Sequence, residues 1–152
     1  MRRKIVAGNW KMNKTLDQGL QLVDEILSSD KSSSEVLKII VPPFIHLAAI
    51  EEKLKSREDF AVAAQNCHHL KSGAFTGEIS AEMIASTGAK YVIIGHSERR
   101  LYAGETDEIL TQKVNIAIAN ELKPIFCIGE NIDQRNSNTH LETIRAQLKE
   151  AL

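Results

Sequence analysis

Short apolar runs that alternate with longer stretches of helical period constrain the fold of this chain more than any other feature. Several of these runs are apolar at consecutive positions, so both faces of the strands that they predict must be covered. A parallel sheet flanked by helices meets that requirement, and the strand–helix alternation predicts an α/β fold. The predicted strands cover residues 5–7, 37–41, 60–64, 91–94 and 124–128.

The stretches between the runs carry helix start signals. Leucine and valine recur at helical spacing over residues 16–27, and Thr15 with Gln18 forms a capping box at the start. Thr139 and Glu142 form another box before the last apolar face, which reaches Leu152 without a glycine, a proline or a polar tail. We therefore expect the chain to be truncated. Further helices are predicted from residue 44, over 81–86, and over 107–119 with Asn120 as a left-handed cap.

Length, charge and cysteine content limit the domain count and the partners. A chain of 152 residues, 43% hydrophobic and 26% charged, suits one domain over residues 1–152. Its formal net charge of −1 gives no field that would attract nucleic acid or an anionic membrane. Cys67 and Cys127, with no export segment and no run long enough to span a bilayer, favour reduced thiols and a cytoplasmic location.

Polar side chains gather where the predicted strands end. The first strand runs into "GNWKMN" and the fourth into "GHSERR", so Asn9, Lys11, His96 and Glu98 are expected to face one centre at the carboxyl edge of the sheet. There Lys11 could bind an anion, while Asn9 and His96 could polarise a carbonyl. The alternative interpretation is that the charged residues are solvated loop residues and that the histidine is structural.

Two other motifs carry weaker signals. "CHH" at residues 67–69 suggests a metal site, but adjacent residues on an extended segment point to opposite sides and no second ligand pair follows at a recognisable spacing, so no metal is predicted. "SGAFTGE" at residues 72–78 lacks the Gly-Lys-Ser/Thr ending of a phosphate-binding P-loop. We interpret it as a shaped surface loop.

Five fragments, taken in order and spacing, resemble the triosephosphate isomerase family. They are "GNWKMN", "QNC" with "GAFTGEIS", "YVIIGHSERR", "GETDE" and "KPIFCIGE", and together they span the chain. The resemblance implies a (β/α)8 TIM barrel that interconverts dihydroxyacetone phosphate and glyceraldehyde 3-phosphate in glycolysis and gluconeogenesis. It also implies that the reaction uses no metal and no organic cofactor.

The resemblance assigns roles to individual residues. Asn9 and Lys11 match the family's substrate-binding residues, and the Lys11 ammonium would stabilise phosphate and enediolate charge. His96 matches the catalytic electrophile, kept neutral by the start of the helix behind it. Glu98 matches the carboxylate that pairs with the active-site lysine, a role compatible with a structural ion pair. Thr76 lies in a loop similar to the one that the family inserts into a partner subunit, which implies a homodimer.

The chain departs from the family pattern in its length. At about 250 residues for a complete barrel, it supplies about five of eight βα units, an incomplete barrel. The family's "YEPVWAIGTG" segment, whose glutamate removes the substrate proton, is missing, and neither Glu130 nor Asp133 matches that base. We therefore expect a fragment that is inactive alone. The alternative is a non-enzymatic ligand-binding or interaction module derived from the half-barrel.

Overall fold

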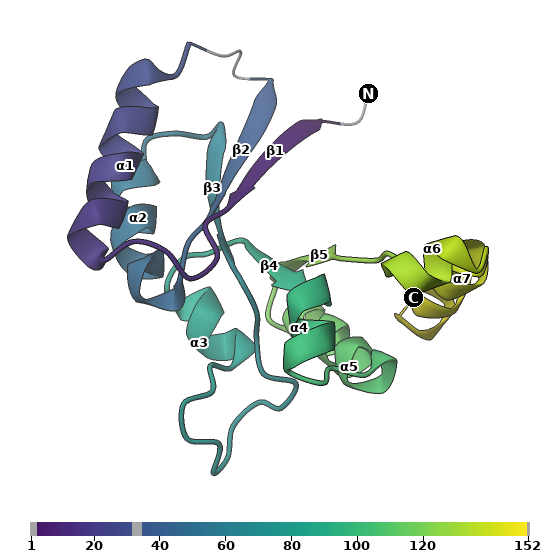
Figure 1. The fold of residues 1–152 in the computed structure, drawn as a ribbon. Coiled ribbons are helices and arrows are strands. Elements are labelled where there is room, and N and C mark those ends of the chain that lie inside the picture. The colour runs from purple at the N-terminus through teal and green to yellow at the C-terminus, as the bar shows by residue number, and fades with distance from the viewer. Residues whose placement is uncertain (1–2, 32–34, 152) are drawn as a thin grey trace.

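The computed structural model describes residues 3–31 and 35–151, in which strands and helices alternate (Figure 1). The elements are β1 (Lys4–Asn9), α1 (Leu16–Ser29), β2 (Val36–Val41), the 3-10 helix η1 (Phe44–His46), α2 (Leu47–Leu54), β3 (Phe60–Ala64), α3 (Ala81–Ser86), β4 (Tyr91–Ile94), α4 (Ser97–Tyr102), α5 (Asp107–Ala119), β5 (Lys123–Phe126), α6 (Ile132–Asn136) and α7 (His140–Ala151). The predicted α/β class is confirmed.

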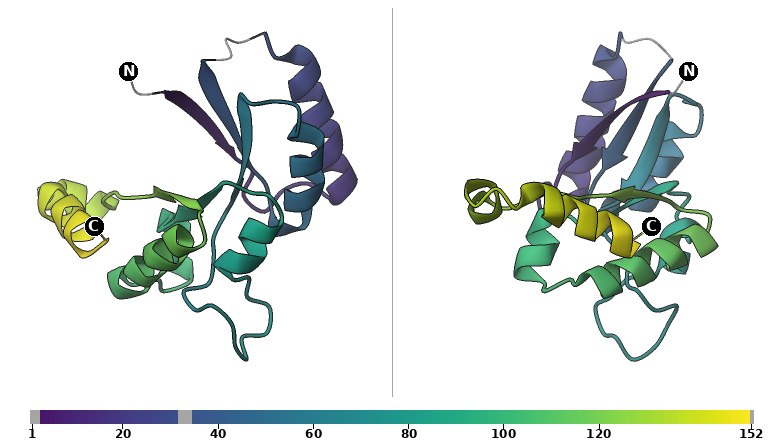
Figure 2. Two further views of the ribbon diagram at one scale, coloured as in Figure 1. Left: turned by 180° about the vertical axis from the view of Figure 1, so that it is seen from behind. Right: turned by 90° about the vertical axis from the view of Figure 1, so that its right-hand side faces the viewer.

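All five strands are parallel and lie in the order β1-β2-β3-β4-β5. The first half of β3 pairs with β2, through residues 60–62, and its last two residues pair with β4. This stagger tilts the strands and curls the sheet, as closure into a barrel requires. Consequently β4 and β5 lie at a steep angle to β1–β3, and the helices cover the outside of the curve (Figures 1 and 2).

Apolar side chains are buried on both faces of the sheet, as the continuous apolar runs predicted. On the outer face, α2 packs against β3, while α5 packs against β4 and β5. The buried strand residues of this outer layer include Ile40, Val62, Val92 and Ile94. A separate inner cluster contains Leu37, Ile39, Val41, Ala61, Ala63 and Ile93. Because successive strand residues point to opposite faces, the two clusters alternate along β2, β3 and β4.

The first strand is the least covered of the five. β1 lies at one end of the sheet and pairs with β2. Its Ile5 and Val6 are 53% and 63% exposed. Unpaired amide and carbonyl groups beside exposed aliphatic side chains form a surface that favours pairing with further strands.

The helix boundaries confirm one capping prediction and overturn another. Thr15 is the N-cap of α1, and its backbone N–H donates to the side chain of Gln18 at 3.0 Å. The left-handed cap predicted at Asn120 is wrong, because Asn120 has a φ of −104° and Glu121, with a φ of 60°, adopts the left-handed conformation instead. The short helix α6, capped by Asn131, was not predicted from the sequence.

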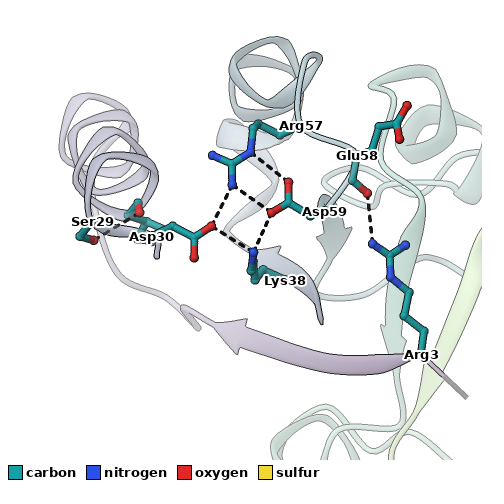
Figure 3. A network of polar contacts seen from close by, with 8 residues as sticks. Arg3, Ser29, Asp30, Lys38, Arg57, Glu58 and Asp59 are labelled. Atoms are coloured by element: carbon teal, nitrogen blue, oxygen red, sulfur yellow. Dashed lines mark hydrogen bonds and ion pairs between the residues drawn. The ribbon is translucent and has the colours of Figure 1, made fainter. Parts of the chain in front are cut away.

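An ion-pair network closes the amino edge of the sheet (Figure 3). The Lys38 ammonium lies 3.0 Å from Asp30 and 2.6 Å from Asp59, and the Arg57 guanidinium lies within 2.9 Å of the same two carboxylates. Hydrogen bonds from Arg57 and then Lys38 hold the pKa of Asp59 well below its usual range. The network therefore ties α1, β2 and the turn before β3 together at the end of the sheet where the strands begin.

Candidate active site

A pocket of about 520 Å³ opens at the carboxyl edge of the sheet, the edge where ligands gather in parallel α/β folds. The four predicted site residues all line it, together with side chains from the segments that follow β1, β3 and β4. The lining includes Asn9, Lys11, Gln65, Asn66, Glu78, His96 and Glu98. β1 and β4 are separated by two strands, so the curl of the sheet brings these residues together.

Lys11 is held in an unusual backbone conformation. Its φ of 53° lies in the left-handed region, which non-glycine residues seldom occupy. Its N–H donates to Asn9 Oδ1 at 3.0 Å, and its carbonyl accepts from Gln65 Nε2 at 2.9 Å. Backbone strain of this kind costs about 1–3 kcal/mol and concentrates at functional sites.

The Lys11 ammonium forms an ion pair across the pocket. Its Nζ donates to Glu98 Oε1 at 2.7 Å. The hydrogen bond from Lys11 is the main reason that the pKa of Glu98 lies below its ordinary value. Both side chains are about half exposed, so the ammonium remains open to a ligand in the pocket.

His96 is delivered to the pocket by the turn between β4 and α4. Gly95 makes this turn with a φ of 76°, and a Cβ there would lie 3.1 Å from the carbonyl oxygen of Cys127. His96 is the N-cap of α4, and its Nδ1 accepts from the backbone N–H of Glu98 at 3.3 Å. An acceptor Nδ1 assigns the proton of a neutral ring to Nε2. The Glu98 carboxylate, 3.5 Å from Nδ1, is too distant for a good hydrogen bond.

A buried charged network lies beneath the pocket, and it was not predicted from the sequence. Lys113 Nζ donates to Glu105 Oε1 at 2.5 Å and to Asn66 Oδ1 at 2.8 Å, and Arg99 Nε also donates to Glu105, at 2.6 Å. The Lys113 and Glu105 side chains are only 4% and 5% exposed. Burial favours the neutral form of Glu105, but the hydrogen bonds from Lys113 and Arg99 outweigh it and lower the pKa of the carboxyl.

Thr76 lies apart from this cluster. It sits in the exposed segment between β3 and α3, which protrudes from the body of the chain (Figures 1 and 2). The interpretation of "SGAFTGE" as a surface loop is therefore confirmed.

His68 and His69 do not point to opposite sides, so that prediction is wrong. Their ring centroids are 4.3 Å apart, and the His68 ring also lies 4.5 Å from Phe75. The segment is not a strand, so the alternation of strand side chains does not apply. Within residues 3–31 and 35–151, no group of three histidine, cysteine or acidic side chains could hold a metal ion.

The two carboxylates after β5 lie outside the pocket lining. Glu130 pairs with Arg135 at 2.6 Å, and a backbone hydrogen bond is the main cause that lowers its pKa. Such a carboxylate is a weak proton acceptor. Asp133 lies in the first turn of α6.

A curled parallel sheet with helices outside it and charged side chains at its carboxyl edge defines part of a TIM barrel, here five βα units. The sequence profile of triosephosphate isomerase matches residues 4–152. The triosephosphate isomerase of Bacteroides fragilis is 54% identical over an alignment of 151 residues that covers 97% of this chain and 59% of that protein. The corresponding protein of Porphyromonas gingivalis is 52% identical over 153 residues, covering 100% of this chain and 61% of the relative.

A more distant relative extends the same pattern. The triosephosphate isomerase of Clostridium beijerinckii is 44% identical over 149 residues, which are 98% of this chain and 59% of that protein. The chain belongs to the triosephosphate isomerase family. It spans about 60% of the length of these curated relatives. Of its described helices, none combines the length and the apolar character needed to cross a membrane.

Proposed function

We propose that this chain is the N-terminal part, residues 1–152, of a triosephosphate isomerase that interconverts dihydroxyacetone phosphate and glyceraldehyde 3-phosphate. The observation that carries the proposal is the convergence of Lys11, His96, Asn9 and Glu98 on one pocket at the carboxyl edge. Membership of the isomerase family favours this function over a non-enzymatic binding module.

The pocket suits a reaction that passes through an enediolate. Removal of a proton from the carbon beside the carbonyl places negative charge on the carbonyl oxygen. Return of the proton to the neighbouring carbon, with transfer of the hydroxyl proton from one oxygen to the other, completes the isomerisation. The Lys11 ammonium would stabilise the phosphate and this developing charge, and the Nε2–H of a neutral His96 would donate to the oxygens. Asn9 would bind the substrate beside them, and Glu98 would orient the ammonium that it pairs with. Side chains alone carry these steps, without a metal or an organic cofactor.

The proton acceptor is the part of the site that this chain is not proposed to supply. Glu130 and Asp133 do not line the pocket, and the relatives contain a further 40% or so of their length beyond the matched portion. We propose that the general base belongs to that portion, so that residues 1–152 alone are inactive. Loss of a general base costs about 10²–10⁴-fold in rate.

The setting of the enzyme follows from the same proposal. The protein would act in glycolysis and gluconeogenesis in the cytoplasm. The protruding segment with Thr76 would insert into a second subunit to form a homodimer, because an exposed loop in which the rings of His68 and Phe75 pack against each other presents a shaped surface. Neither nucleic acid nor a membrane is proposed as a partner.

The experiment is a coupled assay of triose phosphate isomerisation with the full-length protein and with residues 1–152. The full-length protein should be active and the shorter chain should show no rate above background, while mixing it with a chain that carries the remaining units should restore some rate. In the full-length protein, His96→Ala and Lys11→Met should each lower kcat about 10²–10³-fold. The matched control is Lys14→Met, which alters an exposed lysine of the same loop that lies outside the pocket lining. Full activity in His96→Ala, or a rate from residues 1–152 alone, would contradict the proposal.

A further inference from the structure

The backbone of Lys11 needs contacts that hold it in place. A lysine at a φ of 53° can relax to the broad negative-φ regions unless its neighbours prevent it. A change in that backbone would redirect the side chain, because the Cα–Cβ bond turns with the peptide units. The direction of the ammonium therefore depends on whatever fixes the two peptide groups of Lys11.

The side chain of Gln65 fixes one of these peptide groups. Its Nε2 donates to the Lys11 carbonyl at 2.9 Å and to the Val41 carbonyl at 3.1 Å. Val41 is the last residue of β2, and its carbonyl also accepts from the N–H of Trp10 at 3.0 Å. The single side-chain amide of Gln65 thus links the loop after β1 to the end of β2.

The geometry separates Gln65 from the residues that would bind a ligand. An amide NH₂ has two hydrogens, and the carbonyls of Lys11 and Val41 use both of them. Although Gln65 lines the pocket, its donors are therefore committed to the backbone. The second peptide group of Lys11, its N–H, is held by Asn9 at 3.0 Å.

We propose that Gln65 is a positioning residue of the active site, which clamps the Lys11 carbonyl and thereby keeps the Lys11 backbone in the left-handed conformation that aims the ammonium at Glu98. The part of this inference that concerns catalysis rests on the proposed isomerase function. The part that concerns the Lys11 conformation rests on the hydrogen bonds alone.

The test compares two glutamines in the full-length protein whose side-chain amides both form hydrogen bonds with the backbone. Gln65→Met keeps the length of the side chain and removes both donors. Gln147→Met is the matched control, since Gln147 Nε2 donates to the carbonyl of Gly129 at 3.1 Å and its Oε1 accepts from the N–H of Gly129 at 2.9 Å, away from the pocket. The first readout is the pKa of the Glu98 carboxyl, which is measured by NMR titration of the isotope-labelled side chain.

Gln65→Met should raise the pKa of Glu98 towards 4.5, its ordinary value, because the Lys11 hydrogen bond that lowers it is lost. Gln147→Met should leave it unchanged. In a Lys11→Gly background, Gln65→Met should have no further effect on this pKa, since no ammonium remains to be aimed. If Gln65→Met does not fold, Gln65→Asn keeps the amide but shortens its reach and should raise the same pKa. A Glu98 pKa that matches the wild-type protein in the folded variant would overturn the proposal.

The second readout separates the positioning role from the proposed function. Misplacement of a catalytic group by about 1 Å can cost on the order of 10²-fold, so kcat/KM for the triose phosphate should fall by up to about 10²-fold in Gln65→Met and should stay near wild type in Gln147→Met. A raised Glu98 pKa with unchanged kcat/KM would uphold the clamp and refute the catalytic role given to Lys11. An unchanged pKa would refute the clamp, whatever the activity.

Discussion

Replacement of Lys113 by methionine should destabilise the protein far more than the loss of any surface lysine. The substitution leaves the Glu105 carboxylate, 5% exposed, with Arg99 as its remaining charged partner. Removing one partner of a buried ion pair costs about 3–5 kcal/mol, because the other charge stays buried without compensation. Retention of Arg99 places the expected loss at the lower end, about 3 kcal/mol, which corresponds to a fall in Tm of roughly 6–12 °C for a protein of the relatives' size.

The assay is thermal unfolding of the full-length protein followed by circular dichroism. The matched control is Lys53→Met, which breaks an ion pair with Asp24 at 2.7 Å whose side chains are 33% and 60% exposed. A surface pair of that kind contributes about 0–1 kcal/mol, so Tm should fall by at most about 4 °C. The double variant Lys113→Met with Glu105→Leu should recover much of the loss, because no buried carboxylate remains. Equal shifts for Lys113→Met and Lys53→Met would refute the assignment of a buried, tightly coupled pair.

Three further outcomes follow from single sites. Gly95→Ala should destabilise the protein more than Gly104→Ala in urea unfolding. Both sites have positive φ, but only the new Cβ at Gly95 would crowd the carbonyl of Cys127, at 3.1 Å. Equal losses of unfolding free energy would show that this crowding has no effect. Cys67 should resist iodoacetamide at neutral pH until the protein unfolds, since burial raises the pKa of its thiol to about 11 and leaves it 1% exposed; rapid labelling of the folded protein, followed by mass spectrometry, would contradict this. Folding lowers the pKa of Asp59, so its ion pairs stabilise the protein at pH values above 3.8, the ordinary pKa, and this stability is lost as the pH falls below that value. Asp59→Asn should therefore flatten the acid side of a plot of Tm against pH. An unchanged slope would argue against the network of Figure 3.

The strands and the main site residues could be predicted because each rests on a local signal. The strand predicted over residues 91–94 is observed as β4, and the strand predicted over 60–64 is observed as β3. The gathering of Asn9 and His96 follows from a rule of topology, since parallel strands share one carboxyl edge. Asn9 and His96 belong to non-neighbouring strands, so their proximity depends on the curl of the sheet. That curl comes from the stagger along β3 and not from any local pattern.

The features that escaped prediction depend on contacts between distant segments. Lys113 is 47 residues from Asn66 and appears in sequence as an ordinary polar residue of an amphipathic helix. The clamp by Gln65 on Lys11 joins two loops that are 54 residues apart. Asparagine prefers the left-handed conformation more than glutamate does, yet Glu121 has the positive φ and Asn120 does not. In each case the deciding contact or conformation has no signature within one helix or strand.

The wide separation of Lys11 and Glu98 along the chain sets an order of events during synthesis. The two residues of this ion pair are 87 positions apart, and at roughly 5–20 residues per second a ribosome needs about 4–17 s to make the stretch between them. Each of β2 to β5 pairs with the strand made just before it, so the early sheet can grow while translation continues. The Lys11 ammonium, by contrast, stays hydrated and without the Glu98 carboxylate until β4 and the start of α4 have been synthesised. The first strands of the sheet can therefore pair well before the ion pair of the pocket can form.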